Sequence, residues 1–367
     1  GKRMIRVLQI TDHLEMGGIQ AFLMNLYRNI NRDEVQFDFL IFRNTKQWYE
    51  DEIYELGGRI YKAPGRKKGI IKCYKYLNEF FKMHPEYKII HYNASSLSFI
   101  LPLKIAKKYN VNKRIIHCHS SSFMGNNIHK YLHNLHKKKI NEIANVYLSC
   151  SKPATEWMYG NTPILNKVIM VKNGINCDEY LYSENIREEY RKKLNINNAY
   201  VVGHVGRFSK VKNHSFLIDI FCEIKKLQNN AVLLLVGDGE LKNDIEKLAV
   251  SKSISSSVIF LGNRNDVSML MQAMDILVMP SFYEGFPVTI IEAEASGLPI
   301  IMSDTITNEV CVNSNIKIKS LNESSQIWAK EALKNTIRVK TNKKIKDSGL
   351  DIKSTVTQLC NIYKDKD

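Results

Sequence analysis

Residues 276–293 read ILVMPSFYEGFPVTIIEA, and this stretch decides the fold. The four apolar residues Ile276–Met279 predict a short buried strand. A loop with two prolines and a glycine follows, and the apolar residues of Thr289–Ser296 predict a helix. A strand, a loop and a helix in this order form the repeating unit of a parallel sheet that is covered by helices.

The same unit recurs along both halves of the chain. In the second half the expected strands are Tyr200–Val205, Ala231–Val236, Val258–Leu261, Ile276–Met279 and Ile300–Met302, with expected helices at Ser215–Leu227, Leu241–Val250 and Val267–Met274. In the first half the expected strands are Ile5–Ile10, Val35–Phe42, Ile89–Tyr92, Arg114–Cys118 and Val146–Cys150, with expected helices at Ile19–Asn29 and Ile70–Met83. The polar stretch 173–198 shows no strand pattern and is expected to be a linker. The pattern predicts two doubly wound α/β domains that face each other across a cleft.

The composition is ordinary for a globular protein, but the charge is not. Hydrophobic residues make up 44% of the 367 residues, which excludes wholesale disorder and a collagen-like repeat. Lysine and arginine number 53 against 37 acidic residues, a net charge of +16. Residues 1–180 hold 28 basic and 15 acidic residues, so most of the excess lies in the first half. Such a balance predicts an anionic partner, which could be nucleic acid, an acidic membrane surface or a phosphorylated ligand.

The seven cysteines and the apolar runs bear on the compartment. The cysteines are scattered without a CxxC pair, which is typical of free thiols in a reducing compartment. The chain starts with a short strand pattern rather than a signal peptide, and no apolar run reaches the ~18 residues of a membrane span. We therefore expect a cytoplasmic protein, which could still bind the inner face of the plasma membrane.

Charged side chains follow two of the strands expected in the second half. Arg207 and Lys212 come just after Tyr200–Val205, at the carboxyl end where ligands of open α/β sheets bind. Two such cations would neutralise a diphosphate, although a solvated basic loop is an alternative. Glu284 lies in the loop after Ile276–Met279, and Glu292 lies eight positions later on the expected helix. A helical carboxylate here can accept hydrogen bonds from two vicinal hydroxyls, as a ribose offers.

Two helix starts could bind phosphate. The amides of Val288 and Thr289 lie near the start of the helix that carries Glu292. Gly17 and Gly18 follow the first strand and open a helix, where backbone can approach an anion. This pair lacks the third glycine of a dinucleotide fingerprint, so an ordinary tight turn is the alternative and a dinucleotide dehydrogenase is disfavoured.

A pair of histidines ends a strand in the first half. His117 and His119 flank Cys118 at the end of Arg114–Cys118. Histidine is suited to proton transfer and polar contacts near neutral pH. No third ligand is evident nearby, so a metal site is not expected, and structural histidines are the alternative.

These elements together resemble the family 4 retaining glycosyltransferases of GT-B fold, which make bacterial capsules, exopolysaccharides and lipid-linked sugars. The resemblance covers nearly the whole chain. Its elements are Gly17-Gly18, the histidine pair, Asn173-Gly174-Ile175, Val205-Gly206-Arg207 with Lys212, Leu235-Val236-Gly237-Asp238-Gly239, Phe260-Leu261-Gly262, the run from Asp275 to Ser281, and the two glutamates. It implies an acceptor-side Rossmann-like domain at 1–175, a nucleotide-sugar-binding domain at 176–350 and a terminal helix at 351–367 that crosses back to the first domain.

The resemblance also implies a role for each site residue. Arg207 and Lys212 would bind the nucleotide diphosphate, Glu284 would face the donor sugar, and Glu292 would hold the ribose. His119 would lie near the donor sugar and the acceptor, although Cys118 between the two histidines leaves His117 as a candidate. The remaining donor contacts implied are Gly17, Gly18, Asn263, Gly285, Phe286, Pro287, Val288 and Thr289.

The implied reaction moves a sugar from a nucleotide donor, most often UDP-linked, to a hydroxyl of a glycan or lipid-linked acceptor with retained configuration. Cations and a helix start would stabilise the leaving diphosphate, so no metal and no other cofactor is expected. A sugar-nucleotide epimerase or a phosphorylase of the same fold is the alternative. A nucleic-acid binder is disfavoured, because no basic run is interleaved with aromatic residues. The charge of the first half instead favours an anionic membrane surface, against the alternative of a merely solvated, lysine-rich face.

Overall fold

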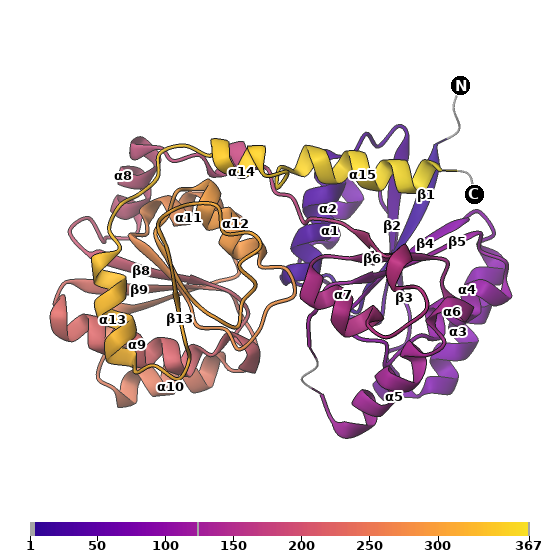
Figure 1. Ribbon diagram of the computed structural model, residues 1–367, viewed down its shortest axis with the longest axis horizontal. Helices are drawn as coiled ribbons and strands as arrows, with labels where there is room; N and C mark the ends of the chain where they lie inside the picture. The colour runs from indigo at the N-terminus through magenta and orange to yellow at the C-terminus, as the bar shows by residue number, and fades with distance from the viewer. Residues whose placement is uncertain (1–3, 123–124, 366–367) are drawn as a thin grey trace. The chain divides into compact units, whose positions relative to one another are not determined.

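The computed structural model describes residues 4–122 and 125–365 and divides into two α/β units (Figure 1). The first unit comprises residues 1–173 together with 352–367, and the second comprises residues 174–351. The boundaries expected from the sequence, after residues 175 and 350, lie within two residues of these limits.

The first unit is built on a seven-stranded parallel sheet with the order β3-β2-β1-β4-β5-β6-β7. Its strands are β1 Ile5–Ile10, β2 Val35–Ile41, β3 Ile60–Lys62, β4 Ile89–Ala94, β5 Lys113–Cys118, β6 Val146–Ser149 and β7 Ile169–Met170. The central strands β1, β2 and β4 are buried along almost their whole length, as strands covered on both faces must be.

Helices cover this sheet. They are α1 Gly18–Asn29, α2 Glu50–Glu55, α3 Ile70–Met83, α4 Leu101–Lys108, α5 Asn127–Lys137, α6 Ile140–Ile143, α7 Lys152–Tyr159 and α15 Ile352–Lys364. The last of these comes from the far end of the chain and lies beside α1 (Figure 1). The expected return of the terminal helix to the first domain is therefore confirmed.

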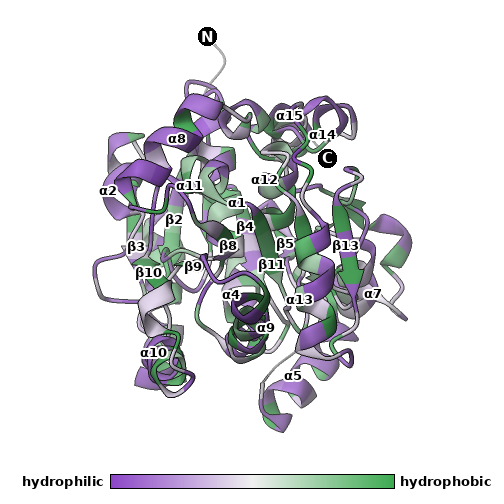
Figure 2. Cartoon of the chain, turned by 90° about the vertical axis from the view of Figure 1, so that its left-hand side faces the viewer, coloured by the Kyte–Doolittle hydropathy of each residue, from purple (hydrophilic) through white to green (hydrophobic). Residues whose placement is uncertain are grey.

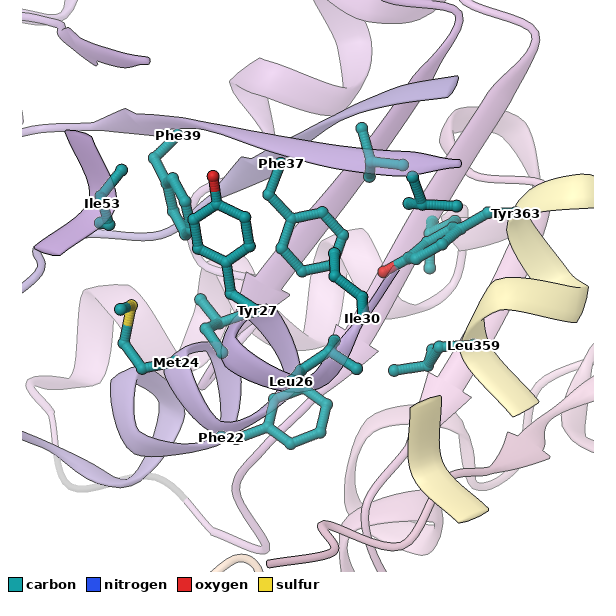
Figure 3. Packing of buried hydrophobic residues seen from close by; sticks show 14 of the residues in the cluster. Phe22, Met24, Leu26, Tyr27, Ile30, Phe37, Phe39, Ile53, Leu359 and Tyr363 are labelled. Atoms are coloured by element: carbon teal, nitrogen blue, oxygen red, sulfur yellow. The ribbon is translucent and has the colours of Figure 1, made fainter. Parts of the chain in front are cut away.

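The core of the first unit joins α1, β2 and α15. Phe22 and Leu26 of α1, Phe37 of β2, and Leu359 and Tyr363 of α15 are all at most 2% exposed (Figure 3). The rings of Phe37 and Tyr363 meet edge to face at 6.0 Å, a favourable geometry for aromatic pairs. The ammonium of Lys113 donates to the carbonyls of residues 362 and 365, where it complements the negative end of the helix dipole.

The second unit is built on a six-stranded parallel sheet with the order β10-β9-β8-β11-β12-β13. Its strands are β8 Tyr200–Val205, β9 Ala231–Val236, β10 Val258–Gly262, β11 Ile276–Met279, β12 Ile300–Ser303 and β13 Ile316–Lys319. Its helices are α8 Glu184–Lys193, α9 His214–Leu227, α10 Lys242–Ser251, α11 Val267–Ala273, α12 Val288–Ala295, α13 Ser325–Lys334 and α14 Lys343–Asp347. Hydrophobic residues concentrate in the central strands, whereas α8 is mostly hydrophilic (Figure 2).

The expected linker is not a loop but contains α8 and the 3₁₀ turn η3 (Cys177–Tyr180). Helix α8 has too few apolar residues for its periodicity to be recognised, and polar contacts hold it instead. Arg187 Nη2 lies 2.5 Å from Asp275 Oδ1, and Arg191 Nη1 donates to the carbonyl of Ala273 at 2.8 Å. This stretch therefore belongs to the second unit rather than to a linker.

Two further findings concern the whole described chain. Among the described helices, none is both long enough and apolar enough to cross a membrane. All seven cysteines are described, and no disulfide joins any two of them.

The packing of α15 predicts the effect of one substitution. Leu359→Ala removes a fully buried side chain and should destabilise the first unit by about 2–5 kcal/mol. The exposed Ser354→Ala on the same helix serves as the control. Hydrogen–deuterium exchange measures the effect: amides of β1 and β2 should exchange faster in Leu359→Ala, while those of β8 and β9 should not change. Equal protection of β1 and β2 in both variants would contradict this packing.

Candidate active site

Two loops meet at the carboxyl edge of the second sheet. One follows β8 and contains the 3₁₀ turn η4 (Lys210–Lys212), and the other connects β11 to α12. The amide of Phe282 donates to the carbonyl of Val211 at 2.8 Å, and Asn213 Nδ2 donates to the carbonyl of Pro280 at 3.0 Å. These two bonds hold the two loops side by side.

Lys212 and Glu284 form an ion pair where these loops meet. Lys212 Nζ lies 2.5 Å from Glu284 Oε1, and Ser281 Oγ donates to the same oxygen at 2.9 Å. The side chains are 19% and 13% exposed, so the pair is largely shielded from water, which strengthens its electrostatic attraction. Two residues expected at the site are thus brought into direct contact.

Glycines make room for this arrangement. Gly237 has φ +129°, and a Cβ there would lie 2.2 Å from the carbonyl oxygen of Gly206. A Cβ on Gly206 would lie 3.3 Å from Lys212 Cδ and 3.2 Å from His204 Nε2. The Lys212 stem therefore lies over the bare face of Gly206, and Gly237 lets the next loop approach from the other side.

Arg207 lies on the same loop but has another partner. Its Nη2 lies 3.2 Å from Glu240 Oε2, in an exposed pair that contributes little to stability. The structure therefore places Arg207 at the expected edge of the sheet but pairs it with Glu240. Asn263 follows β10 at the same edge, directly after Gly262, whose φ is +67°.

Helix α12 begins directly after the loop that carries Glu284. The loop contains Gly285, Phe286 and Pro287, and the helix starts at Val288 and Thr289. The amide of Val288 already donates to the carbonyl of Phe286 at 2.9 Å. Of the two amides expected to face a phosphate, that of Val288 is thus occupied by the loop itself.

Glu292 lies one turn further along α12 and is buried. Burial raises its pKa to about 8; a hydrogen bond with Tyr180 of η3 opposes this rise, and the charge of Glu179 adds to it. A buried carboxyl with so few partners is stabilised by any ligand that donates hydrogen bonds to it. Two hydroxyl groups of a ribose would meet that requirement.

In the first unit, Gly17 and Gly18 begin α1. Gly17 is the N-cap, its backbone is extended, and its carbonyl accepts from the amide of Ala21 at 2.8 Å. A Cβ on Gly17 would lie 2.5 Å from Gln20 Oε1, while Gly18 faces open space. Gly18 is therefore the more accessible of the two positions.

His117 and His119 stack at the carboxyl end of β5, with ring centroids 4.0 Å apart. His117 is fully buried, whereas His119 is partly exposed. Burial lowers the pKa of His119 to about 3 and that of His117 well below its usual value, so both are neutral at pH 7. One nitrogen of each ring is already hydrogen-bonded inside the unit, His117 Nδ1 to His91 and His119 Nε2 to Asn93.

The sequence did not indicate Ser281, His91 or Asn93. Ser281 stands three positions before Glu284 in the decisive stretch, and this spacing is the signal that could have revealed it. His91 and Asn93 are polar residues on the buried strand β4, and alternation within that strand was the only signal. Within the described residues, no group of three or more histidine, cysteine or acidic side chains has a geometry that could hold a metal ion.

Two parallel-sheet domains with a terminal helix returning to the first define a protein of the GT-B class. Solved structures confirm the fold. HepE from Anabaena, solved in complex with UDP and glucose, superposes with a TM-score of 0.81 at 18% identity, over 99% of this chain and 100% of that chain. WaaG, a glycosyltransferase involved in lipopolysaccharide biosynthesis, has a TM-score of 0.71 at 16% identity, over 99% and 100%.

Sequence comparison identifies the family. Residues 186–338 match the model of the glycosyl transferases group 1. EpsF of Bacillus subtilis (strain 168), named as a glycosyltransferase, is 31% identical over 98% of this chain and 96% of its own. CapH of Staphylococcus aureus, a capsular polysaccharide biosynthesis glycosyltransferase, is 24% identical over 99% of both chains. The chain belongs to the group 1 glycosyltransferases, and the family resemblance noted in the sequence is confirmed.

The buried carboxyl of Glu292 predicts a pH-dependent stability difference. Its pKa is about 8 in the folded state and about 4.3 when unfolded, so the folded protein holds a proton that the unfolded chain releases. The wild type should therefore lose stability relative to Glu292→Gln as the pH rises from about 4 to 8, by several kcal/mol in order of magnitude. Urea unfolding of the two proteins at pH 5 and pH 8 measures the difference. Glu294, whose pKa burial raises to about 7, is present in both and cancels. A difference that is the same at both pH values would contradict the shift.

Proposed function

We propose that this glycosyltransferase transfers a hexose or an N-acetylhexosamine from a UDP-sugar to a hydroxyl acceptor, with retained anomeric configuration. The observation that carries the proposal is the shielded Lys212–Glu284 pair beside the start of α12. It provides a cation for a diphosphate and a carboxylate for sugar hydroxyls within one small volume.

The donor and the acceptor class are supported by the relatives. HepE was solved with UDP and glucose, so a protein of this fold accommodates a uridine nucleotide and a hexose. An Escherichia coli relative, 32% identical over 40% of this chain, is named a UDP-Gal:alpha-D-GlcNAc-diphosphoundecaprenol alpha-1,3-galactosyltransferase. CapH is named for capsular polysaccharide biosynthesis. We therefore propose a glycan or lipid-linked acceptor in cell-surface polysaccharide or glycolipid synthesis.

In this mechanism the departing UDP gains negative charge as the bond to the anomeric carbon breaks. Lys212 and Arg207 stabilise that charge, so the reaction needs no metal ion. Arg207 leaves its exposed partner Glu240 at little cost, because such surface pairs are weak. Glu292 binds the ribose, and Asn263 presents backbone to the base.

The Lys212–Glu284 pair changes partners when the donor binds. In the structure the ammonium of Lys212 and the carboxylate of Glu284 compensate each other's charge. A bound UDP-sugar would draw the ammonium toward its phosphates and offer sugar hydroxyls to the carboxylate, so both charges remain compensated. The backbone of residues 285–289 would complete the sugar contacts of the second unit. For His119 of the first unit we propose a contact with a bound sugar, as the family resemblance implies. The acceptor hydroxyl would then attack from the side of the leaving group, with a donor phosphate oxygen accepting its proton.

Substitutions of the ion pair test this proposal. Lys212→Ala and Glu284→Ala should each lower sugar transfer by about 10²-fold or more, because each removes a group that acts on developing charge. Lys210→Ala, an exposed lysine of the same turn, is the control and should keep wild-type activity. Transfer is measured in the presence of EDTA with UDP-sugars and a lipid-diphosphate sugar acceptor.

Three outcomes would contradict the assignment. Near wild-type transfer by either variant would remove the pair from the mechanism. Loss of wild-type activity in EDTA would show that the leaving group needs a metal. Conversion of the UDP-sugar without acceptor to an epimer would instead identify a sugar-nucleotide epimerase.

We also propose that α5 binds an anionic membrane surface. Ile128, Tyr131 and Leu135 lie on one face of this helix and are 69%, 67% and 43% exposed. Lys130 and Lys138-Lys139 lie beside them and are exposed. Apolar side chains flanked by lysines are typical of helices that lie in the headgroup region of acidic lipids. The +13 net charge of residues 1–180 has the sign that this surface requires.

Vesicle sedimentation tests the role of α5. Replacing Ile128, Tyr131 and Leu135 with serine should reduce binding to vesicles containing anionic phosphatidylglycerol by about tenfold or more, because each apolar side chain contributes about 1–2 kcal/mol. The matched control replaces Leu227, Val250 and Ile337, apolar residues of the second unit that are 57%, 65% and 75% exposed. Equal sedimentation with neutral and anionic vesicles would contradict the proposal.

A further inference from the structure

A chain of hydrogen bonds joins buried polar side chains of neighbouring strands in the first unit. It begins at Tyr363 of α15, whose hydroxyl lies 3.1 Å from Gln9 Nε2 and 2.6 Å from His91 Nδ1. His91 Nε2 lies 2.8 Å from His117 Nδ1. Figure 3 shows the Tyr363 ring entering the core from α15 beside Phe37. The chain thus links the terminal helix to the histidine pair.

A second branch joins the same chain to His119. Asn93 Nδ2 lies 3.0 Å from Gln9 Oε1, and Asn93 Oδ1 lies 2.9 Å from His119 Nε2. Gln9, His91 and Asn93 are each at most 4% exposed, so water does not compete for these bonds. Most donors and acceptors in such a buried network have a partner.

Heavy-atom positions alone permit two directions for the hydrogen bonds. The nitrogen and oxygen of the Gln9 and Asn93 side-chain amides could be exchanged. Each hydrogen bond could then run in the opposite direction, and His91, His117 and His119 would carry their proton on Nδ1 instead of Nε2. The direction of the hydrogen bonds therefore has to be decided by a group that can only donate or only accept.

The backbone carbonyl of His91 decides the direction. It lies 3.1 Å from the terminal atom of Asn93 assigned as Nδ2, and the carbonyl of Ile10 lies 3.5 Å from the same atom. A carbonyl oxygen only accepts, so that atom must be the NH₂ group, and Asn93 Oδ1 must face His119. Placing an oxygen there would set two acceptors against each other without a proton between them.

The remaining bonds follow in order. Asn93 donates to Gln9 Oε1, so Gln9 Nε2 donates to the Tyr363 oxygen. The Tyr363 hydroxyl then donates to His91 Nδ1, and His91 Nε2 donates to His117 Nδ1. In the other branch, His119 Nε2 donates to Asn93 Oδ1. In this direction all three histidines carry their proton on Nε2, and that of His117 has no partner among the residues that the structure describes.

In this assignment His119 Nδ1 is a hydrogen-bond acceptor. Its Nδ1 carries a lone pair, is buried, and has no hydrogen-bond partner among the residues the structure describes. A neutral histidine whose pKa is about 3 cannot gain a proton there at pH 7. A buried acceptor of this kind is stabilised when a ligand donates to it.

We infer that Asn93 is a positioning residue that holds His119 as the Nε2–H tautomer, so that Nδ1 accepts a hydrogen bond from a hydroxyl of a bound sugar. The inference rests on the proposed function for the identity of the ligand as a sugar. The tautomer itself depends only on the network in the first unit. A sugar lacking the hydroxyl that reaches Nδ1 should bind more weakly, because the acceptor would stay buried and unpaired.

Histidine NMR tests the tautomer without any substrate. In protein labelled with ¹⁵N-histidine, long-range ¹H–¹⁵N spectra at pH 7 distinguish Nε2–H from Nδ1–H rings. We expect the Nε2–H pattern for His91, His117 and His119, each assigned by the loss of its signals in a His→Asn variant. The Nδ1–H pattern at His119 would overturn the inference whatever the activity of the enzyme.

Two variants then separate positioning from stability. Asn93→Ala should abolish the single tautomer of His119 and lower kcat/KM for sugar transfer by about tenfold or more. Tyr87→Phe removes a buried hydroxyl of the same unit that donates to Asp38 of β2 at 2.6 Å, and it leaves the network intact. It should keep both the tautomer and the activity.

The outcomes distinguish the two proposals. Loss of the tautomer in Asn93→Ala with unchanged kcat/KM would overturn the positioning role while leaving the proposed function standing. A wild-type protein that shows the Nε2–H pattern but transfers no sugar would overturn the proposed function and the sugar as ligand, while the assigned tautomer would stand.

Discussion

In a parallel sheet all strands end at the same edge, and the position of every candidate side chain depends on this constraint. In the second unit it brings the loop after β8 and the loop after β11 together, so that Lys212 and Glu284 meet although 71 residues separate them in the chain. In the first unit it sets His91 and Asn93 of β4 beside His117 of β5 and His119 directly after it, where neighbouring strands run in register. Backbone pairing thus brings the positions of both clusters together, whatever side chains those positions carry.

Burial of two carboxyl groups on α12, the helix of the candidate active site, costs free energy. Glu292 and Glu294 point from one helix into protein rather than water, and burial raises the pKa of both. Glu294 is partly compensated by the amides of Val312 and Asn313, which donate to it at 2.7 and 2.9 Å. Glu292 has less compensation, which is the state expected of a group that awaits a ligand. The structural carboxylate and the candidate binding carboxylate are thus distinguished by their partners rather than by their burial.

Much of the fold could be predicted from the sequence, because apolar strands and amphipathic helices carry strong periodic signals. The strands at Tyr200–Val205 and Ile276–Met279 and the helix at Ile70–Met83 have the predicted limits. Helix α8 was missed because ion pairs with Asp275, not an apolar stripe, hold it in place.

The site was predictable to a lesser degree. Residues in motifs, such as Lys212 and Glu284, could be named, but their direct contact could not, because it depends on how two loops fold. The network through His91 could not be predicted, since its partner Tyr363 lies 272 residues away in the chain. The sequence of a strand does not indicate which residue a buried polar side chain contacts. Pairing with Glu240 was likewise not foreseen for Arg207, because exposed ion pairs leave no periodic pattern.

The return of α15 to the first unit also has a consequence for biosynthesis. Leu359 and Tyr363 complete a core whose other members lie between residues 7 and 171. During translation the second unit emerges whole before these residues leave the ribosome. The first unit to be synthesised is therefore completed only after the second, and until α15 has emerged its core keeps an open apolar face that a chaperone could cover.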